Sequence, residues 1–316
     1  MAGKIIAVAG ATGAQGGGVV RAILADKSGG FAARALTRDP KSDKAKALAD
    51  LGAEVVQADL HDAASVRRAF DGAYGAYCVT FFWAHMSPET ELKEARSMAE
   101  AAKAAGLQHV IWSTLEDTRK SVPLSDDRMP TLMGKYKVPH FDVKGEADAL
   151  FEASGVPVTY LIASFYWENF IYFGMNPKKG PDGKLVLSLP MADKKLSGIA
   201  AEDIGKVAYG IFKQGPAATA GRRIGIVGEH LTGAEIAAKM SKALGQPVEY
   251  NPVPFEVFRN LGFPGADDLG NMFQFYAEFE EQLVATRDLA KTRALNPELQ
   301  TFDQWLARNK DKLPLE

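Results

Sequence analysis

The sequence of 316 residues contains a single cysteine, Cys78. One cysteine cannot form an intrachain disulfide, and no spacing of cysteine and histidine residues predicts a zinc site. Cys78 lies in the apolar run 76–79, so we expect a buried and unreactive thiol. A chain of this length can bury enough apolar surface to fold without disulfides or structural metals. We therefore expect no metal site.

The sequence also lacks a long apolar run and an excess of one charge. No stretch approaches the roughly 20 apolar residues of a membrane-spanning helix, and the short apolar run after residue 3 leads into glycines, unlike a signal peptide. The 37 basic and 39 acidic residues give a net charge of −2, which gives no reason to bind nucleic acid or anionic membranes. We expect a cytoplasmic protein, also nuclear in a eukaryote, with no membrane or direct nucleic-acid contact.

The first half of the sequence alternates short apolar runs with segments of helical periodicity. Strands are predicted at residues 4–9, 31–37, 54–58, 75–80, 109–113 and 157–162. Near-continuous apolar strands in repeated strand–helix units indicate a parallel sheet that is covered on both faces. The predicted fold is therefore α/β, a doubly wound Rossmann-type sheet whose ligands bind at the carboxyl ends of the strands.

The sequence rhythm changes after about residue 163, where aromatic residues and Pro/Gly-rich loops become frequent. We predict a dinucleotide-binding domain at 1–162 and a smaller, interleaved C-terminal α+β domain at 163–316 that closes the cleft. The strand-like segment 223–228 is a candidate to rejoin the first sheet. No internal repeat is evident.

Three glycines spaced by three residues, Gly10, Gly13 and Gly16, follow the first predicted strand. Without side chains, such a turn lets the backbone approach a pyrophosphate closely. The helix that follows presents free N–H groups and the positive end of its dipole to the phosphates. A glycine triplet alone is weakly specific, but here it joins a strand to an apolar-faced helix, as the motif requires. We therefore predict a dinucleotide-binding turn.

The residue after the second strand indicates which dinucleotide is bound. NAD-binding Rossmann domains place an acidic residue there to accept the ribose 2′-hydroxyl. Here the strand ends at Arg38, with Lys41 three residues on, and an arginine is suited to a 2′-phosphate. Asp39 is the competing residue, because NAD would be preferred if it faced the ribose. We predict NADP(H), bound through Arg38 and Lys41.

Segments spread over nearly the whole chain combine into one family pattern. They are 10–17 (GATGAQGG), 36–40 (LTRDP), 52–59 (GAEVVQAD), 140–146 (HFDVKGE), 166–170 (YWENF), 261–268 (LGFPGADD), 271–276 (NMFQFY) and 303–306 (DQWL). Together they resemble the NmrA-like family of atypical short-chain dehydrogenase/reductases, and most of all its animal NADPH-sensing members. The C-terminal segments are the most specific, because no cofactor constraint dictates them.

The resemblance implies roles for the matching residues. The pyrophosphate would lie on Gly10, Ala11, Thr12, Gly13, Ala14 and Gln15, and the 2′-phosphate on Arg38. Further contacts would come from Asp59 and Leu60 at the adenine, Thr80, Phe81 and Phe82 along the ribose and nicotinamide, Lys144 at the nicotinamide ribose, and Tyr166 and Asn169 over the nicotinamide. Close relatives are more basic just after the arginine, so the strength of the NADP preference stays open.

The catalytic tyrosine of short-chain dehydrogenases is missing. In their Tyr-x-x-x-Lys motif the lysine assists the tyrosine, which exchanges a proton as hydride moves. Here Lys144 is present, but the tyrosine position holds His140. His140 would be a general acid, or a structural residue while Lys144 only anchors the ribose. Ser113, near the position of the usual catalytic serine, is either that residue or a strand-end cap.

Two functions follow from these residues. The first is an NADP(H)-responsive regulator with little or no catalysis, favoured by the missing tyrosine. The second is an NAD(P)H-dependent reductase of a small carbonyl or quinone-like substrate, which the retained lysine permits. The sequence leaves open whether a protein partner or a second copy binds.

Overall fold

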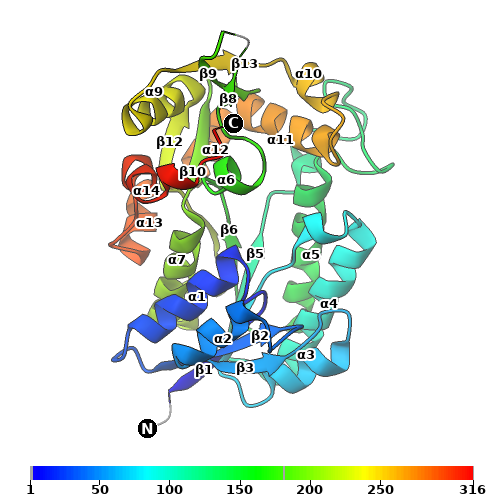
Figure 1. Ribbon diagram of the computed structural model, residues 1–316. Helices are drawn as coiled ribbons and strands as arrows, with labels where there is room; N and C mark the ends of the chain where they lie inside the picture. The colour runs from blue at the N-terminus through cyan, green and yellow to red at the C-terminus, as the bar shows by residue number, and fades with distance from the viewer. Residues whose placement is uncertain (1–2, 181, 316) are drawn as a thin grey trace. The chain divides into compact units, whose positions relative to one another are not determined.

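Seven strands form one sheet in the order β11-β6-β5-β4-β1-β2-β3 within residues 3–180 and 182–315, which the computed structural model describes (Figure 1). They are β1 Lys4–Val8, β2 Phe31–Thr37, β3 Glu54–Gln57, β4 Gly75–Cys78, β5 His109–Thr114, β6 Val158–Ile162 and β11 Arg223–Gly225. Strands β1 to β6 pair in parallel. Every residue of β4 and β5 is buried, as expected of strands covered on both faces. The predicted doubly wound α/β fold is confirmed.

The order of the strands reverses at β1, which lies between β2 and β4. Parallel strands end at the same edge of the sheet, so the segments that follow β1, β2 and β4 meet there. Such a reversal is where doubly wound sheets bind their ligands. The glycine turn, Arg38 and Thr80 belong to these three segments.

Helices cover both sides of the sheet. Figure 1 shows α1 (Ala14–Ala25) and α7 (Ala201–Gln214) on one side, and α3 (Ala63–Phe70), α4 (Pro88–Ala104) and α5 (Pro139–Ser154) on the other. The short helices α2 (Asp43–Asp50) and α8 (Pro216–Thr219) follow β2 and α7. Helices α1 and α7 pack at close range because both have glycines at the crossing: a Cβ at Gly205 would lie 2.2 Å from the carbonyl carbon of Gly18.

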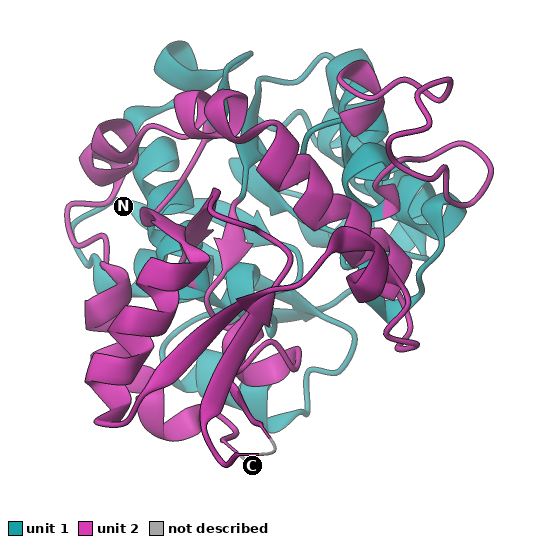
Figure 2. Ribbon diagram, turned by 90° about the horizontal axis from the view of Figure 1, so that it is seen from above, with its two compact units in different colours: residues 1–117, 140–163, 201–224 teal, residues 118–139, 164–200, 225–316 magenta. Residues whose placement is uncertain are grey.

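The chain divides into two compact units, coloured separately in Figure 2. The first contains residues 1–117, 140–163 and 201–224, and the second contains 118–139, 164–200 and 225–316. The sequence predicts a boundary after residue 162, with the segment 223–228 as a candidate to rejoin the first sheet. The structure differs at two segments, since 118–139 groups with the second unit and 201–224 with the first. The reason is spatial: α7 packs on α1, and β11 extends the first sheet beside β6.

The second unit contains two three-stranded sheets, ordered β12-β10-β7 and β13-β9-β8. The strands are β7 Phe165–Tyr166, β8 Lys178–Lys179, β9 Leu185–Leu189, β10 Lys195–Ile199, β12 Glu229–Thr232 and β13 Val248–Pro252. The helices are α6 Asn169–Tyr172, α9 Gly233–Leu244, α10 Phe255–Arg259, α11 Ala266–Glu278, α12 Glu280–Thr286, α13 Leu289–Leu295 and α14 Phe302–Asn309. Some of the aromatic residues that become frequent after residue 163 are core: Phe273, Phe275 and Tyr276 are buried in α11.

Across the described residues, no helix is both long enough and apolar enough to span a membrane.

Candidate functional site

The turn between β1 and α1 is shaped by its glycines. Gly10 has φ +61°, in the left-handed region that favours glycine. A Cβ at Gly16 would lie 2.4 Å from the carbonyl oxygen of Gly10 and 2.6 Å from that of Ala9, so a larger residue does not fit. Gly13, the N-cap of α1, has no side chain to cap the first turn. The exposed turn therefore offers helix N–H groups to an anion, as a pyrophosphate site requires.

Gln15 anchors this turn to the sheet beneath it. Its side-chain Oε1 accepts hydrogen bonds from the Tyr77 hydroxyl and from Ser113 Oγ, the latter at 2.8 Å. Tyr77 lies on β4 and Ser113 on β5, so one amide ties the start of α1 to two central strands. Ser113 thus has a structural partner at the position where a catalytic serine was considered.

The segment after β2 separates the two side chains that compete for the ribose. Asp39 Oδ1 accepts the backbone N–H of Lys41 at 2.9 Å, so its carboxylate is engaged in a local turn. Arg38 is exposed, and only its carbonyl oxygen has a hydrogen bond among the described contacts, from Gln57 Nε2 at 3.2 Å. The Lys41 side chain is exposed as well. The guanidinium is therefore available to an anion, whereas one oxygen of the Asp39 carboxylate is engaged by the Lys41 amide.

A cleft of about 280 Å³ opens beside the turn and against α2. Its lining consists of Ala11, Thr12, Arg21, Lys44, Ala47, Leu48 and Leu51. Two of these seven residues, Arg21 and Lys44, are cations, and none is acidic. The environment of the turn therefore favours negatively charged groups.

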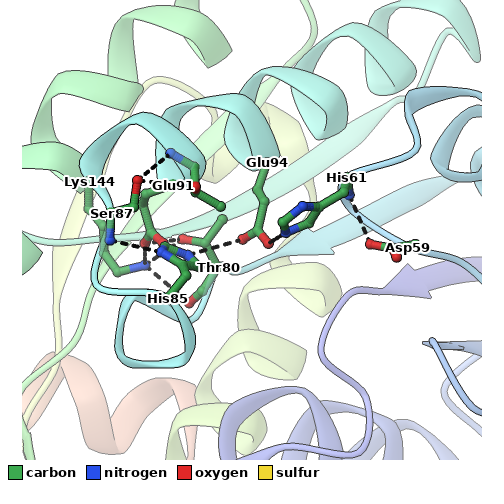
Figure 3. Close-up of polar contacts among 9 residues, drawn as sticks. Asp59, His61, Thr80, His85, Ser87, Glu91, Glu94 and Lys144 are labelled. Atoms are coloured by element: carbon green, nitrogen blue, oxygen red, sulfur yellow. Dashed lines mark hydrogen bonds and ion pairs between the residues drawn. The ribbon is translucent and has the colours of Figure 1, made fainter.

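Lys144 lies in a buried polar network at the carboxyl end of β4 (Figure 3). Its Nζ donates to the Thr80 carbonyl oxygen at 3.1 Å, to Thr80 Oγ1 at 2.6 Å and to Glu91 Oε1 at 2.6 Å. Thr80 Oγ1 in turn donates to the same carboxylate oxygen at 2.5 Å. The Glu91 side chain is fully buried and that of Lys144 is 11% exposed. Lys144 extends from helix α5. Its ammonium group is held by three contacts, two to Thr80 after β4 and one to Glu91 on helix α4.

The network continues towards solvent through two histidines (Figure 3). His85 Nε2 lies 3.2 Å from Glu91 Oε2 and 3.9 Å from Glu94 Oε2. Glu94 Oε1 lies 2.8 Å from Nε2 of His61, whose side chain is half exposed. A line of alternating carboxylate and imidazole groups therefore leads from the buried lysine to the surface.

The two carboxyl groups of this network differ in electrostatics. Burial by itself would raise the pKa of Glu91, but the charge of Lys144, the close His85 ring and hydrogen bonds from Lys144 and Thr80 outweigh it and hold the pKa at about 2. For Glu94, burial and then the negative charge of Glu91 raise the pKa above its usual value. Glu91 is therefore the ionised partner of Lys144.

His85, Glu91 and Glu94 also bring ligand atoms within 4.8 Å of one another, as a metal site would. However, Nδ1 of His85 accepts the Ser87 amide at 3.1 Å, so the neutral ring carries its hydrogen on Nε2, the atom that faces the carboxylates. A ligating nitrogen must present a lone pair instead. Lys144 already supplies a positive charge to Glu91. These two features favour an Nε2–H group facing the carboxylates over a metal, with Nε2 and Glu91 Oε2 in contact at 3.2 Å but outside hydrogen-bond geometry.

His140 lies in the first turn of α5 among aromatic rings. Its ring centroid is 4.7 Å from those of Trp83 and Phe141 and 6.2 Å from that of Phe82, and the residue is 6% exposed. Packing of this kind fixes the ring in the hydrophobic interior of the first unit. The position is that of a structural side chain more than of a mobile acid.

The remaining predicted residues are distributed between the units. Asp59 and Leu60, after β3, are half-buried, and Asp59 Oδ1 accepts the His61 amide at 2.9 Å. Phe81 is 57% exposed while Phe82 is buried. Tyr166 ends β7 and Asn169 begins α6, both half-buried in the second unit. The structure brings together Thr80 and Lys144, and places the glycine turn and Arg38 on neighbouring strand ends.

Sequence reasoning missed Glu91, the closest ionic partner of Lys144. A signal was present, because Glu91 shares the buried face of α4 with Ala95, Met98 and Ala102, at spacings of four, seven and eleven residues. An acid on the apolar stripe of a helix needs a buried partner. Identifying that partner required the fold.

Comparison with known proteins places these features in one family. A model of the NmrA-like family matches residues 2–306. The NmrA-like family domain-containing oxidoreductase FrzB of Cladobotryum sp is 30% identical over 295 residues, which span 86% of this chain and 83% of the relative.

Two similar solved structures are those of NmrA, described as a negative transcriptional regulator, one in complex with NADP and one with NAD. Each has a TM-score of 0.79 and 25% identity, and covers 97% of this chain and 95% of the other. The similarity therefore extends over both units of the chain.

Proposed function

Because the chain belongs to the NmrA-like family, we propose that it binds NADP(H) and acts as a regulator that responds to this cofactor with little or no catalysis. Such a protein would change a surface or a loop when the cofactor binds, and a protein partner or second copy would detect the change. A cytoplasmic location fits this role.

The glycine turn supports cofactor binding. An uncapped helix N-terminus and a glycine at φ +61° suit a pyrophosphate, and Gly16 lets the backbone of the turn pack without the Cβ that would clash with it. When bound, the nicotinamide would supply a hydride. Lys144 and Thr80 would lie near the nicotinamide ribose, because they are at the carboxyl end of β4, the strand that pairs with β1.

Arg38 supports NADP(H) over NAD(H). NmrA itself is known in complex with either dinucleotide, so family membership does not decide the preference. In this chain the carboxylate of Asp39 is engaged with the Lys41 amide, while the Arg38 guanidinium is exposed. Arg21 and Lys44 add positive charge beside the turn.

The packing of His140 is the observation on which the regulatory role rests. Hydride transfer to a carbonyl creates an alkoxide, which needs a positioned acid. The side chain at the tyrosine position is buried among three aromatic rings, and Lys144 already has three acceptors. Neither group is poised to deliver a proton to a substrate.

A reductase is the second candidate, favoured by the name of the relative FrzB as an oxidoreductase. Lys144 is the group of this chain that would take part. With a substrate bound, its ammonium would stabilise developing negative charge on an oxygen. In this alternative the His140 ring would have to leave its aromatic packing to donate a proton to the substrate oxygen.

Turnover separates the two candidates. We expect NADPH in the presence of quinones, aldehydes and ketones to be oxidised no faster with the wild-type protein than with Lys144→Ala, because a positioned acid typically contributes about 10²–10⁴-fold. Loss of absorbance of the reduced nicotinamide measures this. Rapid turnover that disappears in both Lys144→Ala and His140→Ala, but not in the exposed control Lys93→Ala on α4, would establish the reductase instead.

Hydrogen exchange tests the proposed response. We expect NADPH to protect residues 38–44 and 80–90, which follow β2 and β4 at the binding edge, because ligands commonly order such loops. Residues 63–70 of α3 are the internal control and should not change. Equal exchange of both loops with and without NADPH, at saturating cofactor, would remove the basis for a sensor.

A further inference from the structure

The ion pair between Glu91 and Lys144 joins two helices at the edge of the sheet where the cofactor is expected. We propose that Glu91 is the positioning residue of Lys144: its buried carboxylate compensates the ammonium charge and holds the group at the sheet edge where the nicotinamide ribose is expected, so that a ribose hydroxyl replaces the longest contact, to the Thr80 carbonyl oxygen at 3.1 Å. The inference rests on the proposed function, because Lys144 matters here only if a dinucleotide binds.

The geometry leaves the ammonium little freedom. An ammonium group has three N–H donors, and Lys144 Nζ has three acceptors: two oxygens of Thr80 and Glu91 Oε1. The ring of Trp112 lies 5.6 Å from Nζ as a further favourable contact. Of these partners only Glu91 carries a charge. Thr80 fixes direction, and Glu91 compensates the buried positive charge.

Other charged groups near the pair point elsewhere. Glu94, one turn along α4, is 2.8 Å from His61. Asp148, one turn along α5, contacts Arg223 at 2.6 Å and Trp112 Nε1 at 2.9 Å. His85, from the segment before α4, faces the second oxygen of Glu91. Among the described residues, Lys144 therefore forms its ion pair with Glu91.

Because the pair is buried, loss of the Glu91 charge would leave Lys144 without a counter-ion. Glu91 is fully buried, where an unpaired charge is strongly disfavoured. Glu91→Gln keeps the size and one acceptor oxygen but removes the negative charge. The variant's Lys144 would then be a nearly buried cation with no counter-ion, so it would lose its proton more readily as pH rises. Its hydrogen bonds to the cofactor would weaken in parallel.

The first experiment is calorimetric titration of NADPH between pH 6.5 and 9.5 with wild type, Glu91→Gln, Glu94→Gln and Lys144→Met. We expect Glu91→Gln alone to lose about tenfold in affinity as pH rises, which is the lower limit for one hydrogen bond to a charged group. Glu94→Gln is the matched control on the same helix and should follow the wild-type profile. Lys144→Met should be weaker but parallel to wild type, and so should the double variant Glu91→Gln/Lys144→Met.

A second measurement is independent of the cofactor. Trace acetylation of the cofactor-free protein with acetic anhydride, quantified by mass spectrometry, reports how much of Lys144 is the reactive neutral amine. We expect faster labelling of Lys144 in Glu91→Gln than in wild type or Glu94→Gln at the same pH. If wild type binds no NADPH, the proposed function fails, while labelling still decides the role of Glu91.

Folding of the variants is the remaining control. Should Glu91→Gln not fold, Glu91→Asp keeps the charge on a shorter side chain and should show the wild-type pH profile with weaker binding. Identical pH profiles and labelling rates for Glu91→Gln and Glu94→Gln would overturn the proposal, and so would a steep pH dependence in Glu91→Asp.

Discussion

Replacing Arg38 with alanine is expected to weaken NADPH binding by about ten- to a hundredfold and to leave NADH binding nearly unchanged. A hydrogen bond to a charged group contributes roughly 1.5–3 kcal/mol, and about 1.4 kcal/mol corresponds to a factor of ten. The fold should not suffer, because the side chain is exposed at the end of β2. Calorimetric titration with both cofactors measures the two affinities.

The control for this variant is Arg67→Ala, which removes an exposed arginine from α3. It should bind both cofactors as wild type does, at matched ionic strength. An equal loss of NADPH and NADH affinity in Arg38→Ala would mean that the arginine does not recognise the 2′-phosphate. Asp39→Ala is then the informative variant, since its carboxylate would be the ribose ligand.

Replacing Gly16 with alanine is expected to abolish measurable cofactor binding and to lower stability. The added Cβ would lie 2.4 Å from the Gly10 carbonyl oxygen and 2.6 Å from that of Ala9. Both atoms belong to the backbone and can move only if the turn opens. Forced overpacking typically costs about 1–3 kcal/mol, and an opened turn no longer presents its N–H groups together. Thermal unfolding with and without NADPH measures both effects.

Gly205→Ala provides the matched comparison. Its Cβ would lie 2.2 Å from the carbonyl carbon of Gly18, so a similar clash occurs where α7 crosses α1, beyond the turn. We expect both variants to unfold at lower temperature, but only Gly205→Ala to be stabilised by NADPH. A cofactor-induced rise in the Tm of Gly16→Ala equal to that of wild type would show that the turn does not hold the pyrophosphate.

The parts of the fold that were predictable are those with local causes. Apolar runs bounded by turns predicted β1 to β6, and β2 was located at its observed bounds, Phe31–Thr37. Pro88 at the first turn of α4 and the Ser87 N-cap define the start of that helix. The glycine turn is likewise a local feature, because positive φ and the lack of a side chain are properties of single residues.

The features that were missed depend on contacts between distant segments. Glu91 and Lys144 are 53 positions apart, and only the neighbouring positions of α4, the end of β4 and α5 bring them together. The assignment of α7 to the first unit depends in the same way on its packing against α1, where the two helices cross at Gly205 and Gly18. Periodicity reports which face of a helix is buried, but not what lies opposite.

The alternation of the chain between its two units has a consequence for how such proteins diverge. The chain changes unit after residues 117, 139, 163, 200 and 224. A single genetic crossover between two related genes, at any internal position, therefore separates segments of at least one unit from their packing partners. Unlike a tandem arrangement of domains, this architecture cannot exchange its second unit by one recombination event. Exchange of the whole second unit would take a crossover at each of these five changes of unit.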